Sequence, residues 1–217
     1  MNNIIQNLAP AMLLLEKGLL GLLLVLGAST LGIFIWRSRS YARSQGKPQK
    51  WMRLLTQEMT SPRIPSLVLT PDDEATLAGR VVRTGIANQG LNSQALEKVF
   101  EVQESAEKRE LEKGLSFLAT VGANAPFLGL TGTVIGILVA FERFAASGGK
   151  GSTEVMVSIS QALVATAVGL VVAIPAVVFF NILKQKSKAV LEGGREVRGL
   201  LLARSLQAAR MGAGREA

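Results

Sequence analysis

The chain has 217 residues and a formal net charge of +8; 48% of its residues are hydrophobic, only 5% are aromatic, and 22 are glycine. This profile is typical of closely packed membrane helices, in which small residues let helix backbones approach one another. Cysteine and histidine are both absent, which excludes disulfides, thiolate or imidazole metal sites, and histidine as a general base. We expect no metal, no cofactor and no enzymatic activity.

Three long stretches contain no Asp, Glu, Lys or Arg, and they define the expected membrane spans. They run from 18 to 36, from 114 to 141 and from 155 to 183, and a helix needs only about 20 apolar residues to cross the hydrocarbon core. We predict an all-α membrane protein with transmembrane helices at 18–36, 114–143 and 155–183, the second including its helical approach. Three buried helices of a soluble protein are the alternative, but so short a chain could hardly enclose them.

The distribution of charge orients these spans. The segment between the first two spans contains 13 Lys or Arg residues and 10 Asp or Glu residues. The segment after the third span contains 8 Lys or Arg residues and 3 Asp or Glu residues. Because positive loops stay in the cytoplasm, we expect 37–113 and 184–217 there, with 1–17 and the turn 144–154 on the opposite side. This bias accounts for the net charge without nucleic-acid binding. The basic cluster follows the first span, which favours a retained anchor over a cleaved signal peptide.

The segments predicted to be cytoplasmic begin with a connector and a capped helix. Residues 44–70 are rich in Gln, Pro and Ser and indicate the connector. Thr70 is placed to cap a helix whose first turn contains one proline and three acidic residues, a composition that stabilises a helix start. Gly85 or Gly90 can end this helix.

Two longer helices are predicted beyond it. Apolar residues recur at helical spacing through 96–106, and no strong breaker separates this segment from the second span, so we predict one continuous helix of about 45–50 residues. The third span is expected to continue as a helix to Leu191. After a possible break at Gly193–Gly194, the tail should be helical again.

One short motif, SGGKGST at 147–153, resembles a phosphate-binding loop. In such loops a serine or threonine directly follows the lysine, whereas Gly151 follows Lys150 here. The segment also joins two spans instead of following a strand. We interpret it as a flexible turn.

Small residues form a stripe along each of the last two spans, which predicts tight helix packing. We expect this packing to involve several copies, because three helices alone enclose no wide pore. Pro126 and Pro175 each remove a helix hydrogen bond and are expected to kink their helices. The stripes consist of Gly122, Ala125, Gly129, Gly132, Gly136 and Ala140 in the second span, and of Ser158, Ala162, Ala165, Gly169, Ala173 and Ala176 in the third.

Three polar residues border these stripes and are the candidate functional residues. Thr133 and Thr166 have two open interpretations, because a threonine can satisfy its hydroxyl on its own helix without any function. Gln161 cannot be satisfied by one backbone carbonyl and should face protein or water, not lipid. No span contains a titratable group at depth, so a proton path would need a carboxylate from a partner.

Two motifs carry a family resemblance: LATVGANAPFLGLTGTVIGIL at 118–138 and ISQALVATAVGLVVAIPAVVFFN at 159–181. They resemble the MotA/TolQ/ExbB family of ion-driven motor proteins, and the three-span layout resembles its ExbB and TolQ branch. The resemblance implies residence in the bacterial inner membrane, with a periplasmic N-terminus and a cytoplasmic C-terminus. It also implies a ring of five copies around two copies of a single-span ExbD- or TolR-like partner.

The resemblance further implies roles for the candidate residues. The partner's membrane aspartate would carry the proton, and Thr133 and Thr166 match threonines that line the ion path in the family. Enterobacterial members carry a glutamate where this chain has Gln161, so protonation at that position is in doubt here.

The favoured hypothesis is a proton-channel and motor-ring subunit that energises work at the outer membrane through a TonB- or TolA-like protein. TonB-dependent transport is preferred, with the Tol–Pal system and gliding motility as alternatives, and proton and sodium coupling both stay open. A passive membrane scaffold is the alternative from another class. A secondary transporter fits less well, because paired repeats and buried charges are lacking.

Overall fold

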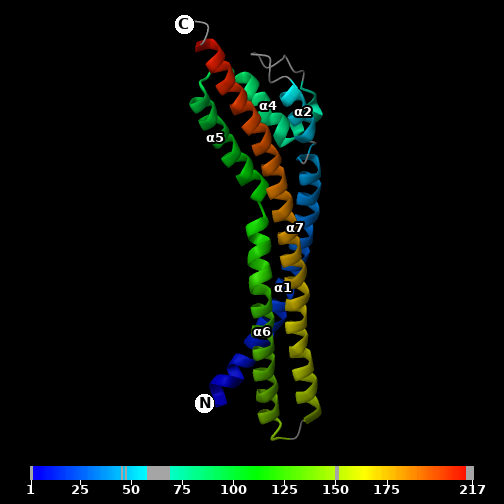
Figure 1. Ribbon diagram of the computed structural model, residues 1–217. Helices are drawn as coiled ribbons and strands as arrows, with labels where there is room; N and C mark the ends of the chain where they lie inside the picture. Colours follow the sequence, from blue (N-terminus) through cyan, green and yellow to red (C-terminus); the bar gives the residue numbers. More distant parts are fainter. Residues whose placement is uncertain (1, 45, 47, 58–68, 150–151, 214–217) are drawn as a thin grey trace. The chain divides into compact units, whose positions relative to one another are not determined.

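The computed structural model describes residues 2–44, 46, 48–57, 69–149 and 152–213, which are helical apart from short turns and contain no strand (Figure 1). They divide into two compact units. Unit 1 comprises Met1–Ile35 and Gly114–Ile182, and unit 2 comprises Trp36–Lys113 and Leu183–Ala217. The helices are α1 (Asn2–Ser44), α2 (Pro48–Gln57), α3 (Pro71–Ala75), α4 (Leu77–Ala87), α5 (Ser93–Glu112), α6 (Leu115–Ala146) and α7 (Ser152–Ala213).

Three of these helices, α1, α6 and α7, are long and apolar enough to cross a membrane, judged by length and composition. This confirms the prediction of an all-α protein with three spanning helices. Helices α6 and α7 continue through Pro126 and Pro175 respectively, so neither proline ends its helix. Of the predicted turn at 144–154, Lys150 and Gly151 lie outside the described residues.

In unit 1, helices α6 and α7 run side by side (Figure 1), and their small-residue stripes pack against each other. A Cβ added at Gly136 would lie 2.4 Å from the Cβ of Ala162, and one at Gly169 would lie 2.7 Å from the Ala125 carbonyl oxygen. Every residue of both stripes is buried. The stripes therefore meet within one chain, where each helix finds a complementary small face on its own neighbour, and the involvement of further copies stays a prediction.

Helix α1 completes the core of unit 1. Its Leu23 is fully buried, and the Cβ of an alanine at Gly27 would lie 3.1 Å from a methyl group of Val172. The rings of Phe34 and Phe179 stack with centroids 4.0 Å apart. The buried apolar cluster consists of Leu23, Val121, Ala125, Val172, Ala173 and Ala176.

In unit 2, Thr70 caps a helix as predicted. Its hydroxyl accepts a hydrogen bond from the Asp73 backbone N–H at 3.3 Å, and the Asp73 carboxylate accepts one from the Thr70 backbone N–H at 3.2 Å. The predicted single helix after Thr70 is nevertheless two, because Thr76 is extended (φ −92°, ψ 150°). The Thr76 hydroxyl accepts from the Gly79 N–H at 3.1 Å and so starts α4. Helix α4 ends at Ala87, between the two glycines predicted to end it.

The predicted continuous helix into the second span is wrong, because the chain breaks between α5 and α6. Gly114 adopts a left-handed conformation (φ +80°) that side chains disfavour. The carbonyls at the end of α5 accept hydrogen bonds from side chains of α1. A guanidinium nitrogen of Arg37 donates to the Leu111 oxygen at 2.6 Å and also to the Glu110 oxygen. The Tyr41 hydroxyl donates to the Leu111 oxygen as well.

The two other departures concern α7 and the connector. Helix α7 continues through Gly193–Gly194, so the possible break predicted there is absent. These glycines instead leave room for neighbouring side chains: an added Cβ would lie 3.1 Å from Pro48 at Gly193 and 2.9 Å from Leu77 at Gly194. Within the predicted connector, α2 is a helix whose Trp51 and Leu55 are buried. Residues 58–68 of that connector lie outside the described residues.

Candidate ion-path site in unit 1

The structure brings Thr133 of α6 and Thr166 of α7 together. The Thr166 hydroxyl donates to the Thr133 hydroxyl oxygen at 3.5 Å, a long hydrogen bond. The Thr133 hydroxyl itself donates to the Leu130 carbonyl at 2.7 Å. Thr133 is buried and Thr166 is half-buried, so the two hydroxyls form a polar pair within an otherwise apolar helix contact.

The small-residue stripes position this pair. Gly132 and Ala165 directly precede the two threonines, and a Cβ at Gly132 would lie 2.7 Å from the Ala165 Cβ. Because the two backbones approach so closely at Gly132 and Ala165, the side chains of the next residues, Thr133 and Thr166, reach each other across the helix contact. A neighbouring threonine, Thr131, is exposed and donates only to the Phe127 carbonyl of its own helix, at 2.8 Å.

The other predicted packing residues also lie at this contact. Pro175 is half-buried on α7, and the remaining ones are buried. At Gly129, an added Cβ would lie 2.8 Å from the Ala165 carbonyl oxygen and 2.9 Å from the Thr166 Cα. The residues predicted to pack and found buried are Gly129, Gly132, Gly136, Ala162, Ala165, Gly169 and Ala173.

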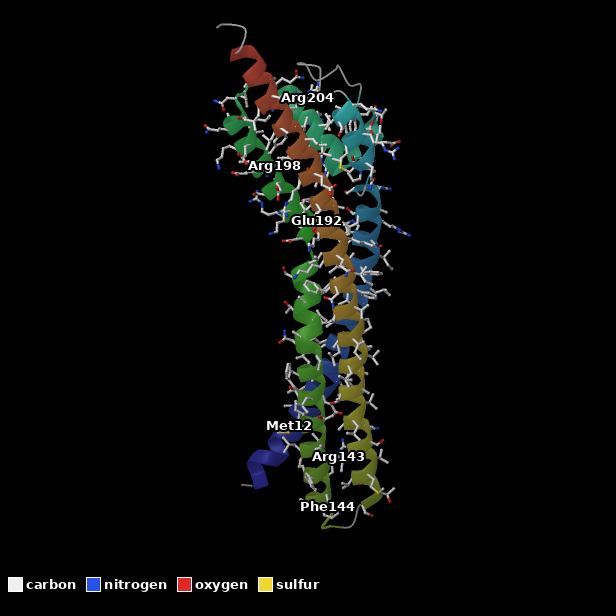
Figure 2. All side chains as sticks on the ribbon, viewed as in Figure 1. Met12, Arg143, Phe144, Glu192, Arg198 and Arg204 are labelled. Atoms are coloured by element: carbon white, nitrogen blue, oxygen red, sulfur yellow. The ribbon has the colours of Figure 1, made fainter. Side chains whose placement is uncertain are left out.

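Gln161 is exposed on α7 and lines a cavity of about 450 Å³ formed by all three helices of unit 1. Near it, a guanidinium nitrogen of Arg143 donates to the Ser158 hydroxyl at 3.2 Å; Arg143 lies between α6 and α7, close to the end of the hairpin that they form (Figure 2). The amide of Gln161 therefore has a polar cavity beside it. The cavity is lined by Glu16, Lys17 and Leu20 of α1, Gly136, Val139 and Arg143 of α6, and Ser158, Gln161 and Val164 of α7.

Glu16 is the residue of this cavity that sequence reasoning missed. It lies two residues before the uncharged stretch at 18–36, in the segment 1–17 that is expected to lie outside the membrane. The structure places it inside α1, which begins at Asn2, and next to Gly136 of α6. The only available signal was an acidic residue directly at the edge of a span. Elsewhere in the described ranges, no three acidic side chains come together in a group that could hold a metal ion.

Comparison with known proteins identifies the family of the chain. A sequence model of the MotA/TolQ/ExbB proton channel family matches residues 73–193, more than half of the chain. The chain belongs to this family. The match contains both threonines, Gln161 and both small-residue stripes.

Individual relatives include both ExbB and TolQ proteins. The biopolymer transport protein ExbB of Aquifex aeolicus is 42% identical over 92 residues, which are 42% of this chain and 62% of the relative. ExbB of Xanthomonas campestris is 38% identical over 109 residues, 50% of this chain and 43% of the relative. The Tol-Pal system protein TolQ of Pseudomonas aeruginosa is 40% identical over 94 residues, 43% of this chain and 41% of the relative. The chain thus matches less than two thirds of the length of these relatives.

Proposed function

We propose that this chain is an inner-membrane ring subunit of a motor driven by the proton-motive force. The observation that carries the proposal is the hydroxyl pair of Thr133 and Thr166, 3.5 Å apart at the close contact between α6 and α7. An apolar helix contact needs no such pair for packing. Membership of a proton channel family gives the pair a role, namely to hydrate a charge that passes through the membrane.

The titrating group at mid-membrane depth is supplied by a partner in this proposal. Neither α6 nor α7 has a charged residue between Lys113 and Glu142 or between Glu154 and Lys184, and proton relays within membranes usually need such a group. An ExbD- or TolR-like protein with one membrane aspartate fits this requirement. Several copies of the chain, five by resemblance, would surround it, with the N-terminus in the periplasm and the C-terminus in the cytoplasm.

The ring would transmit work to the outer membrane, most simply through a TonB-like protein in nutrient uptake. Tol–Pal function through a TolA-like protein is the second candidate, favoured by the 40% identity to TolQ of Pseudomonas aeruginosa; gliding motility is a further alternative. If the polar residues only pack helices, the chain is instead a passive scaffold.

Proton flux separates the motor from the scaffold. We expect the double variant Thr133→Val and Thr166→Val, in the complex isolated with its partner and reconstituted into liposomes, to lower proton flux about tenfold, because hydrogen bonds to a charged group contribute about 1.5–3 kcal/mol. Valine keeps the side-chain shape, so assembly should persist. Thr30→Val is the matched control, since the Thr30 hydroxyl donates to the Gly27 carbonyl of its own helix, α1, at 2.7 Å. Unchanged flux in the double variant would leave the scaffold as the better interpretation.

A further inference from the structure

Glu16 is a carboxylate held inside unit 1, not at its outer surface. It is half-buried, and a Cβ added at Gly136 would lie 3.4 Å from its Oε1 atom. The carboxylate therefore lies against the small-residue stripe of α6, where the absent side chain of Gly136 leaves room for it. The carboxylate also borders the cavity that Gln161 lines.

The cavity beside Glu16 has space for water and few competing charges. Its volume of about 450 Å³ exceeds the roughly 30 Å³ that one water occupies in the liquid many times over. The charged groups lining it are Glu16 and Lys17 from α1 and Arg143 from α6, while α7 contributes the neutral Ser158 and Gln161.

Glu16 is also free of a fixed partner within the described residues. The ion pairs of the described residues do not include Glu16, and Arg143 is engaged with Ser158. The neighbouring acid Glu142 does not line the cavity, and Glu154 is exposed at the start of α7. Among the described residues, Glu16 is thus the carboxylate of this cavity.

We propose that Glu16 is a proton-exchanging residue of the ion path, in addition to the acid that the partner supplies. A hydronium ion in the cavity donates its proton to a Glu16 carboxylate oxygen and leaves as water; the carboxyl then returns the proton to a cavity water beside Gln161. Gln161 cannot titrate, so its amide orients and hydrates this exchange. This inference rests on the proposed function, which requires protons to enter unit 1.

The test uses the complex isolated with its partner and reconstituted into liposomes, with proton uptake followed as a function of external pH. We expect Glu16→Gln to lower flux about a hundredfold, the lower end of what a positioned acid–base group contributes to proton transfer, and to remove a titration from the pH profile. Glu16→Asp should retain the titration. Glu154→Gln is the control and should change neither flux nor profile.

A second-site variant separates a titrating role from a structural one. Because Glu16 and Gln161 line the same cavity, adding Gln161→Glu to Glu16→Gln returns a carboxylate to it, and we expect flux and its pH dependence to recover. A profile of Glu16→Gln equal to that of the wild type, or a loss of flux that Gln161→Glu does not restore, would overturn the proposal.

An infrared measurement makes the inference independent of flux. Acidification protonates the other carboxylates of the complex as well, so the C=O band of protonated carboxyls should be larger in the wild type than in Glu16→Gln by the share of one carboxyl. A wild-type complex without flux refutes the proposed function, whereas a working complex whose infrared titration is unchanged in Glu16→Gln refutes only the assignment of Glu16.

Discussion

At the scale of single residues, Gly129 marks a place where α6 and α7 are in backbone contact. An added Cβ would lie 2.8 Å from the Ala165 carbonyl oxygen and 2.9 Å from the Thr166 Cα. These are backbone atoms, which cannot rotate away as a flexible side chain would. The helices must separate to admit a methyl group, and the threonine pair is moved with them.

We therefore expect Gly129→Ala to destabilise the protein by about 1–3 kcal/mol, as overpacking of a tight contact does. Thermal unfolding of the detergent-solubilised chain measures this. The control is Gly21→Ala, where nothing lies within 4 Å of the new methyl group and alanine favours a helix by about 0.5–1 kcal/mol. Equal melting temperatures for the two variants would contradict the close contact.

Gln161 makes a second prediction at this scale. Its amide lines the polar cavity of unit 1, so Gln161→Leu places an apolar side chain beside charged groups and removes hydrogen-bonding capacity. Gln161→Glu keeps both size and polarity. We expect the leucine variant to impair assembly or coupling more than the glutamate variant does in a growth or motility assay that depends on the partner. The reverse ranking would refute the role of the amide.

At the scale of elements, the end of α5 is stabilised by a cation from α1. Arg37 is only 3% exposed and donates to the carbonyls of Glu110 and Leu111 in the last turn of α5, where carbonyls run out of partners within the helix. The Glu110 oxygen also accepts a hydrogen bond from the Lys113 backbone N–H at 3.4 Å. A positive charge at a helix C-terminus also interacts favourably with the helix dipole. We expect Arg37→Gln to cost about 1.5–3 kcal/mol.

Hydrogen exchange of the amides in the last turns of α5 reports this loss directly, as faster exchange confined to that helix end and its contacts. The matched control is Arg39→Gln, because Arg39 is exposed. If both variants exchange alike, Arg37 does not hold the end of α5.

The start of α3 is an element whose stability depends on pH. Lys50 and Asp73 form an ion pair of 2.7 Å, and the hydrogen bond from Lys50 lowers the pKa of Asp73 below its ordinary value of 3.8. A lowered pKa means that the folded state favours the ionised carboxylate. The stabilisation is therefore complete above about pH 3.8 and is lost as the pH falls through the lower folded-state pKa.

We expect Asp73→Asn to weaken the α3–α4 segment by about 1 kcal/mol near neutral pH, a typical value for a cap. Hydrogen exchange of these amides, corrected for the intrinsic rate at each pH, should show the difference from wild type shrinking once the solution is acidified below that range. Asp72→Asn serves as the control, since Asp72 is exposed. A difference that persists at low pH would show that charge is not its origin.

The elements also show which features the sequence can predict. Uncharged stretches predicted the three long helices, the composition after Thr70 predicted its cap, and the spacing of glycine and alanine predicted the buried faces, because each of these signals is local. The break at Gly114 depends on Arg37 and Tyr41, which lie more than 70 residues away. The place of Glu16 depends on which face of α1 meets Gly136. Contacts of this kind form only when helices pack together, so the sequence alone does not predict the cavity.

At the scale of the whole molecule, a polar stripe on α6 is left uncovered by the part of the chain that the structure describes. We call it the outer polar stripe; its residues lie four or seven positions apart and so share one helix face. Asn124 donates to the Thr120 carbonyl at 2.8 Å, which leaves one amide hydrogen and the side-chain oxygen without a bond in the described residues. The stripe consists of Ser116, Thr120, Asn124 and Thr131, all exposed.

In hydrocarbon an amide with unmet hydrogen bonds costs several kcal/mol, so we infer that water or another subunit covers the outer polar stripe in the assembled protein. The chain contains no cysteine, so in a single-cysteine variant all thiol labelling of the chain comes from the introduced residue. We expect Asn124→Cys and Thr131→Cys to react with a charged, water-soluble thiol reagent about tenfold faster than Leu24→Cys, because the reactive thiolate forms only in water. Leu24 is 64% exposed on α1 and is expected to face lipid.

The two ways of covering the stripe give different products. If other copies pack on it, oxidation of Asn124→Cys or Thr131→Cys should link chains into disulfide dimers, since the cysteines must approach to within about 7 Å between Cα atoms. If water or a single-span partner covers it, the thiols react with the reagent but do not link to one another. Rates equal to that of Leu24→Cys would mean that lipid covers the stripe. In that case this face of α6 would not be a contact between subunits, and the copies of the proposed ring would have to meet through other surfaces.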